Sequence, residues 1–245
     1  MSLYCPILMY HHVGAARPGE KERNVVPVAT FREQLGCLAE RGFEGVSIDR
    51  LAAALRGDPG AGLPGRPAAV SFDDADARRL GPALEVLSAF GFPAAAYLIA
   101  DRPEDFPAPA EAEAMRSAGL TFGSHGLSHG RLTGLSGEEA RREIFESKRV
   151  IEERLGAPVA HLAYPHGAFG PREERLAREA GYLTALSTRR GNRHGRGELF
   201  RLRRLAMRPY TTPRRLGRYL GLAWHLQHSV KETLGLEGRG GARGE

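Results

Sequence analysis

The sequence has few of the residues that mark several common classes of protein. Cysteine occurs only at Cys5 and Cys37, without CxxC spacing, so we expect reduced thiols in or near the core rather than a disulfide. No stretch approaches the roughly 18 apolar residues of a transmembrane helix. The first residues have neither the basic segment nor the apolar run of a secretory signal. These absences predict a cytoplasmic chain with no transmembrane segment.

Lysine is also scarce, occurring only at Lys21, Lys148 and Lys231, so arginine supplies nearly all the positive charge behind the net +6. An arginine excess can favour an anionic partner, but a genome biased toward arginine codons explains it equally simply, and we favour the latter. The chain has no basic sheet interleaved with aromatic residues and no finger spacing. We therefore predict no nucleic-acid partner.

What the chain does have is a regular alternation of short apolar runs with helical patterns. A hydrophobic content of 42% is typical of a soluble globular protein, and 245 residues can bury a substantial core. This alternation favours a parallel sheet, and the number of repeats favours a single α/β domain with a closed or nearly closed barrel. The expected strands are 6–10, 46–48, 68–72, 94–99, 120–124, 161–164, 182–187 and 200–207.

Three helices have recognisable start signals. Thr30-x-x-Glu33 and Ser136-x-x-Glu139 have the pattern of capping boxes, and Gly156 is expected to end the second of these helices. Thr212-Pro213 is expected to open a last helix. Its apolar face would consist of Leu216, Tyr219, Leu220, Ala223 and Trp224.

Polar residues follow four of the expected strands. In a parallel barrel the carboxyl ends of all strands lie on one face, where active sites are built from the loops that follow them. We therefore expect one mouth to gather His11, Asp73, Asp74, His125, Pro165 and His166.

Two histidines and one carboxylate are a ligand set that catalytic zinc uses, with one position left open for water. Glycines at 123, 126 and 130 argue against an uninterrupted helix across His125 and His129, so a solvated helix face is disfavoured. The adjacent acids Asp73 and Asp74 cannot point the same way from a strand end. One can bind a cation while the other remains a base, and this pattern predicts a metal-dependent hydrolase.

These segments resemble the motifs of the polysaccharide deacetylase family, also called the NodB-homology family or carbohydrate esterase family 4. Three are similar to its Thr/Ser-Phe-Asp-Asp-Gly, His-x-x-x-His and Ala-Tyr-Pro-Tyr-Gly motifs. The chain opening is similar to that of the subgroup acting on poly-N-acetylglucosamine and related glycans. In chain order the segments are Pro6-Ile7-Leu8-Met9-Tyr10-His11-His12, Ser71-Phe72-Asp73-Asp74, His125-Gly126-Leu127-Ser128-His129 and Ala163-Tyr164-Pro165-His166-Gly167.

The resemblance covers roughly residues 5 to 210 and implies a deformed (β/α)7–8 barrel that removes N-acetyl groups from a glycan or glycan precursor. It implies a divalent metal, zinc by preference, on Asp74, His125 and His129. By the same resemblance Asp73 is the general base. His11 is the general acid, with His12 as the alternative.

The resemblance also implies an oxyanion and substrate site at Tyr164, Pro165 and His166, in which the backbone amide of His166 binds the oxyanion. The barrel would span residues 1–234, and a disordered Gly/Arg-rich tail would follow at 235–245.

The chain departs from the family pattern at several positions. Ala75 stands in place of a usual Gly, Gly126 of Ser/Thr, His166 of Tyr, and Ala163 of an arginine that orients the base in other subgroups. The late Leu-x-His motif of those subgroups is absent, which is why His11 is needed as proton donor.

Two other functions remain open at this point. One is hydrolysis of a small amide or cyclic imide on the same barrel, and the other is sugar binding or assembly without catalysis. The chain also has a stretch rich in arginine, which could bind the phosphates of a lipid- or nucleotide-linked glycan. We interpret this stretch instead as a solvated surface. It consists of Arg201, Arg203, Arg204, Arg208, Arg214, Arg215 and Arg218.

Overall fold

The computed structural model describes residues 2–221 of the chain. Within these residues, none of the helices is long and apolar enough to cross a membrane. The predicted tail at 235–245 lies outside the described residues, as do Ala223 and Trp224 of the last helix's expected apolar face.

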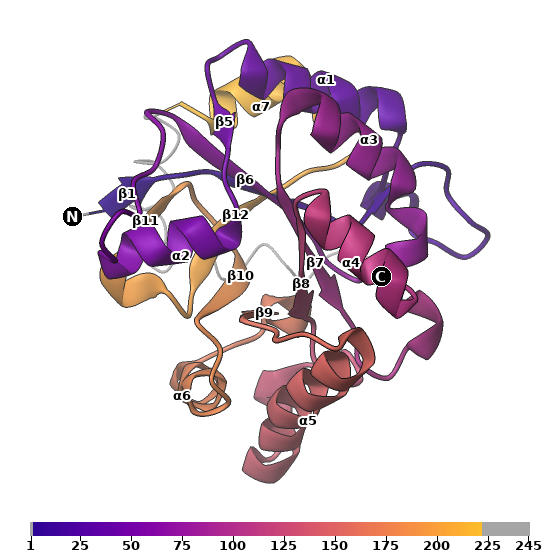
Figure 1. Ribbon diagram of the computed structural model, residues 1–245, viewed down its shortest axis with the longest axis vertical. Coiled ribbons are helices and arrows are strands. Elements are labelled where there is room, and N and C mark those ends of the chain that lie inside the picture. The colour runs from indigo at the N-terminus through magenta and orange to yellow at the C-terminus, as the bar shows by residue number, and fades with distance from the viewer. Residues whose placement is uncertain (1, 222–245) are drawn as a thin grey trace.

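Seven parallel strands close into a barrel, as the alternating pattern predicts (Figure 1). Around the barrel the strands are β2 (Ile7–Tyr10), β6 (Pro67–Phe72), β7 (Ala94–Leu98), β8 (Leu120–Ser124), β9 (His161–Ala163), β10 (Thr184–Arg190) and β12 (Leu202–Ala206). Pairing of β2 with β6 closes the barrel, with Ile7 beside Ala69 and Tyr10 beside Phe72. A short strand, β5 (Glu44–Gly45), extends the sheet beside β6.

Two small pairings lie outside the barrel. β1 (Ser2–Tyr4) is antiparallel to β11 (Arg193–Gly195), and β3 (His12–Val13) is parallel to β4 (Val25–Val26). Among residues 2–221 these strands and the barrel account for all the sheet structure.

Helices surround the barrel on its outer side (Figure 1). They are α1 (Val28–Ala39), α2 (Ile48–Arg56), α3 (Gly81–Phe90), α4 (Pro109–Ser117), α5 (Gly137–Leu155), α6 (Pro171–Glu179) and α7 (Pro213–Tyr219). α7 lies beside α1, where the buried Gln34 amide donates to the backbone oxygen of Thr211 at 2.8 Å.

Two of the predicted helix starts are confirmed, and one is wrong. The Ser136 side chain caps α5 reciprocally with Glu139, α5 ends at Gly156 with φ 62°, and the Thr212 side chain caps α7. Thr30, however, lies inside α1, which starts after Pro27. Proline fixes its own φ, so Pro27 sets the helix start and the Thr30 pattern falls in the first turn.

The predicted strand at 46–48 is also misplaced. β5 ends at Gly45, and Ile48 is the first residue of α2, capped by the Ser47 hydroxyl. A Cβ at Gly45 would lie 2.6 Å from the Phe92 backbone, so only glycine fits this close crossing.

Two apolar layers hold the barrel together. Along β6, Ala68, Val70 and Phe72 face the helices, whereas Ala69 faces the barrel interior, as expected for side chains that alternate along a strand. Ile48, Leu51 and Leu55 of α2 belong to the interior cluster, so α2 closes one end of the barrel. The side chains that follow the carboxyl ends of the strands can therefore gather only at the opposite end. Cys5 and Cys37 are free and buried, as predicted.

Candidate metal centre and active site

The structure confirms that the polar residues predicted to share one mouth follow the carboxyl ends of barrel strands. His11 follows β2, Asp73 and Asp74 follow β6, His125 follows β8, and Pro165 begins a 3₁₀ turn after β9. Strand closure brings these residues together although they are up to 155 positions apart in sequence.

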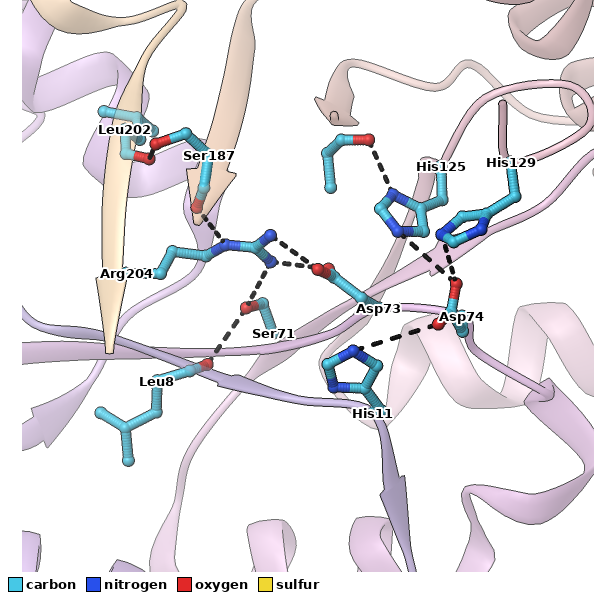
Figure 2. A network of polar contacts seen from close by, with 11 residues as sticks. Leu8, His11, Ser71, Asp73, Asp74, His125, His129, Ser187, Leu202 and Arg204 are labelled. Carbon is cyan, nitrogen blue, oxygen red and sulfur yellow. Dashed lines mark hydrogen bonds and ion pairs between the residues drawn. The ribbon is translucent and has the colours of Figure 1, made fainter. Parts of the chain in front are cut away.

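The two adjacent acids point in different directions, as expected from their place at a strand end (Figure 2). Asp73 is 2% exposed and is held by Arg204 through two parallel hydrogen bonds of 2.6 Å, one to each carboxylate oxygen. Asp74 turns instead toward His125 and His129. The two carboxylates thus occupy distinct chemical environments.

Arg204 is itself fixed on all sides. Its guanidinium also donates to the Ser187 carbonyl at 2.9 Å and to the Ser71 hydroxyl at 3.2 Å, and the side chain is fully buried (Figure 2). Burial alone would raise the pKa of Asp73, but the charge and hydrogen bonds of Arg204 lower it to about 2. Asp73 is therefore anionic at any physiological pH.

The pairing of Arg204 with Asp73 corrects the interpretation of the arginine stretch as a solvated surface. It also provides an arginine beside Asp73, which the motif at Ala163 lacks. Arg204 is neither solvated nor available to a ligand's phosphate; it lies inside the barrel on β12. The arginine that orients the base in other subgroups would stand at Ala163, on β9. Here the charge comes from another strand, so the motif at Ala163 alone gave no sign of it.

Asp74, His125 and His129 form a cluster whose ligand atoms all lie within 4.8 Å of one another. Asp74 Oδ1 is 3.1 Å from His129 Nε2 and 3.6 Å from His125 Nε2. Ligands about 2.0–2.1 Å from a tetrahedral zinc ion lie roughly 3.3–3.4 Å from each other, so the spacing fits a shared ion.

The hydrogen bonding of the cluster supports the same conclusion. His125 Nδ1 is 2.7 Å from the Ala163 carbonyl, which can only accept, so Nδ1 carries a proton and the neutral ring presents its lone pair at Nε2. That lone pair faces Asp74 Oδ1, a buried atom without a hydrogen-bond partner in the described residues. Two acceptors facing each other in a buried site repel unless a cation lies between them. Burial also lowers the pKa of His129 to about 4, leaving the neutral imidazole that a metal requires.

The backbone of the site is strained at three places. In the described chain, Asp74, His129 and His166 are the non-glycine residues with positive φ, at 51°, 66° and 58°. Such conformations cost about 1–3 kcal/mol each and persist only where surrounding contacts impose them. All three belong to the residues predicted for the site.

His11 lies beside the cluster, with Nε2 4.0 Å from Asp74 Oδ2 (Figure 2). Burial lowers the pKa of His11 to about 4, although the charges of Asp73 and Asp74 act in the opposite direction. Its Nδ1 is buried and has no partner among the described residues. His12, the alternative proton donor, starts β3 and forms no hydrogen bond or ion pair with Asp73 or Asp74 in the described chain.

The turn after β9 places only part of the predicted oxyanion segment at the mouth. The His166 ring lies 4.3 Å from the His129 ring, and its Nε2 donates to the His129 carbonyl at 3.2 Å. No hydrogen bond within residues 2–221 uses the His166 backbone N–H as donor. Tyr164, in contrast, stacks on Phe169 and donates its hydroxyl to the Phe200 carbonyl. Its side chain is a core group, which leaves only its backbone for the predicted substrate role.

Other acids and histidines have structural partners. Asp76 caps a short 3₁₀ turn by accepting from the Arg78 amide, and it pairs with Arg17. His161 contacts Thr184 and Asp49, and His194 contacts the Cys5 carbonyl; both histidines are buried. None of these residues belongs to the cluster around Asp74.

Comparison with known proteins agrees with this geometry. The sequence model of the polysaccharide deacetylase family matches residues 61–185, slightly more than half of the chain. YxkH of Bacillus subtilis (strain 168), assigned by its name to the polysaccharide deacetylases, is 22% identical over 218 residues, which cover 88% of this chain and 75% of that protein.

Solved structures show the same fold. The Streptococcus pyogenes deacetylase PplD, in complex with acetate, superposes with a TM-score of 0.78 at 22% identity, covering 90% of this chain and all of PplD. IcaB from Ammonifex degensii superposes with a TM-score of 0.75 at 20% identity, covering 89% of this chain and 97% of IcaB. With the family match over residues 61–185 and the seven-stranded barrel, this chain belongs to the polysaccharide deacetylase (NodB-homology) family.

Proposed function

We propose that this protein is a metal-dependent hydrolase that removes N-acetyl groups from an N-acetylhexosamine-containing glycan or glycan precursor. The observation that carries the proposal is that Asp74 Oδ1, which has no hydrogen-bond partner among residues 2–221, faces the Nε2 atoms of His125 and His129. A buried carboxylate, Asp73, lies next to it in sequence and is kept anionic. Family membership supplies the reaction class.

Asp74, His125 and His129 would hold the cation, and zinc suits this set of two imidazoles and one carboxylate. When bound, it would polarise the acetyl carbonyl and acidify a water molecule. An amide is a poor electrophile, so a water-activating residue is needed as well. We assign this role to the chain's own Asp73.

Asp73 accepts the proton as the water oxygen attacks the acetyl carbon. Each carboxylate oxygen has a second lone pair besides the one bound to Arg204, so the pairing orients the base without blocking it. A carboxylate with a pKa of about 2 is a weak base, and it can act only on a water that has been acidified.

Attack produces an oxyanion, to which the backbone N–H of His166 would donate. The C–N bond then breaks as the amine nitrogen gains a proton, which we assign to His11. Burial keeps its pKa at about 4 even though the charges of Asp73 and Asp74 raise it, so His11 would have to receive, during the reaction, the proton that it passes to the amine. Acetate and the free amine are the products.

The test is acetate release from N-acetylglucosamine oligomers by the purified protein, with and without a chelator and after zinc is added back. Asp73→Asn should retain zinc yet lose nearly all turnover, His125→Ala should lose both, and His11→Ala should lose turnover alone. Asp76→Asn is a matched control, because this nearby acid caps a turn and pairs with Arg17 outside the cluster around Asp74, so its loss should leave turnover intact.

Each outcome bears on a separate part of the proposal. Acetate release that is insensitive to the chelator would remove the metal from the mechanism. Zinc-loaded protein that releases acetate from no N-acetylated sugar, but opens a cyclic amide, would replace the glycan by a small amide substrate. An active Asp73→Asn variant would exclude Asp73 as the base.

A further inference from the structure

The loop between the two histidines is held by one buried carboxylate that belongs to neither the metal ligands nor the acid–base pair. Glu143 of α5 is 8% exposed, and its Oε2 accepts from the backbone N–H groups of Leu127 and Ser128 at 2.9 and 3.1 Å. Its Oε1 accepts from the Ser128 hydroxyl at 2.5 Å. All three donors come from two consecutive residues of the loop.

Within the described part of the chain this carboxylate has no cationic partner. No arginine or lysine of residues 2–221 forms an ion pair with Glu143, so the loop's donors alone offset the cost of burying its charge. An arrangement in which a buried charge depends on one loop also makes the loop depend on that charge. Removing the Glu143 carboxylate would leave the backbone N–H groups of Leu127 and Ser128 without this partner.

The rest of the loop is fixed on its other side. The amides of Ala100 and Asp101, after β7, donate to the carbonyls of Gly126 and Leu127 at 3.1 and 3.0 Å. Leu127 is therefore bound through its carbonyl to one element and through its N–H to Glu143. Glu143 is the charged half of a clamp around the loop.

The first and last residues of this loop need different degrees of support. His125 continues directly from β8, and its ring is fixed by the Ala163 carbonyl. His129 is four residues further on, follows the clamped pair Leu127–Ser128, and has a φ of 66°. A strained residue keeps such a conformation only when neighbouring contacts impose it.

The close packing under the loop leaves no room for a looser arrangement. A Cβ at Gly126 would lie 3.0 Å from Pro165 Cγ and 3.3 Å from Glu143 Oε2. The Glu143 carboxylate and the turn after β9 therefore both pack closely against the loop backbone. α5 is a 19-residue helix with a complete capping box, which makes it a rigid support for this contact.

We infer that Glu143 is a positioning residue that pre-organises His129 for metal binding. This inference rests on the proposed metal site. A loop that already has its metal-binding conformation does not have to become ordered when the metal binds. The free energy of ordering therefore does not reduce the affinity for the metal. Glu143 would act on the metal through the loop, since in the described chain its hydrogen bonds go to Leu127 and Ser128 and not to the histidine rings.

The experiment compares zinc dissociation constants, measured by competition with a chromophoric chelator, in the full-length protein and its variants. Glu143→Leu should weaken zinc binding by about 10- to 100-fold, the range typical for residues that orient metal ligands. Glu143→Gln should weaken it by less than about 10-fold, because the amide oxygen still accepts both N–H groups through neutral bonds roughly half as strong.

Glu152→Leu is the matched control on the same helix. Glu152 accepts from the Val159 N–H at 2.9 Å, so its replacement also leaves a loop amide without its acceptor. Glu152 lies nine residues after Glu143, and Val159 lies outside the loop between the two histidines. Glu152→Leu should leave the zinc dissociation constant unchanged. Melting temperatures of the zinc-free proteins, measured alongside, separate a general loss of stability from a loss of affinity.

The outcomes are distinct. Wild-type affinity in Glu143→Leu, or an equal loss in Glu152→Leu, would overturn the inference and leave the proposed function standing. A wild-type protein that binds no zinc would overturn both. If Glu143→Leu does not fold, unchanged zinc affinity in both Glu143→Gln and Ser128→Ala would overturn the positioning role.

Discussion

Arg204 and Asp73 form the buried ion pair at the centre of the site, and replacing Arg204 by methionine tests its importance. Asp73 has a pKa of about 2 against its usual 3.8. A difference of roughly two units corresponds to about 2–3 kcal/mol of stability, fully present above pH 3.8 and lost as the pH falls through 2. Because this shift is what remains after burial has acted in the opposite direction, the combined attraction of Arg204, His125 and His11 is larger than the net shift.

Arg204→Met therefore leaves a carboxylate buried without its cation. Removing one partner of such a pair costs about 3–5 kcal/mol. Asp73→Asn creates the converse fault, since the buried guanidinium loses its anion. The double variant removes both charges, so it should be less destabilised than the sum of the two single variants by several kcal/mol.

Urea unfolding of the wild type, both single variants and the double variant measures this coupling. Loss of the Arg204 bonds to Ser187 and Ser71 occurs in both Arg204→Met and the double variant, so it cancels in the comparison. Additive effects of the two single variants would refute the pairing as a source of stability. Acetate release by Arg204→Met should fall about 10²-fold or more, the scale of a displaced general base.

Two further predictions concern other parts of the barrel. The hydrogen bond from Arg79 lowers the pKa of Glu20 from 4.5 to about 2, so this pair stabilises the fold above pH 4.5 and loses its effect as the pH falls through 2. Glu20→Gln should lower the free energy of unfolding in urea by about 1 kcal/mol at pH 7, the size typical of a partly exposed ion pair. The difference in unfolding free energy from the wild type should shrink by pH 3, and a difference that stays constant would contradict the assignment. Gly167→Ala should destabilise the protein by about 2–3 kcal/mol, since φ is 65° and the new Cβ would lie 2.0 Å from Thr188 Oγ1. Gly156→Ala, with φ 62° but no atom within 4 Å, should cost only about 1 kcal/mol, and equal losses in urea unfolding would argue against the clash.

The strand ends that carry the site were predictable because parallel strands share one direction. Once Asp74 and His125 were placed after strands, the barrel had to bring them to the same face. The metal cluster follows from that constraint together with the glycines around the histidines. Helix boundaries were less certain where two start signals compete, as at Pro27 and Thr30.

The arginine that holds Asp73 was not predicted, since arginines in a row are usually a solvated surface. The alternation along β12 held the missing signal: Leu202 belongs to the interior cluster, and two residues later Arg204 takes the same side of the strand. The Glu143 clamp had no comparable signal. Two of its three donors are backbone amides, which every residue except proline carries, so only the folded loop reveals them.

The position of Arg204 on the last barrel strand has a consequence for how the protein matures on the ribosome. Asp73 is synthesised 131 residues before its counter-ion. Until β12 emerges and inserts between β10 and β2, Asp73 lacks the arginine that neutralises it in the folded barrel, and burying it carries the cost of an unpaired charge. Sheet closure and maturation of the hydrolytic apparatus thus become a single late event, and C-terminally truncated translation products should be inert.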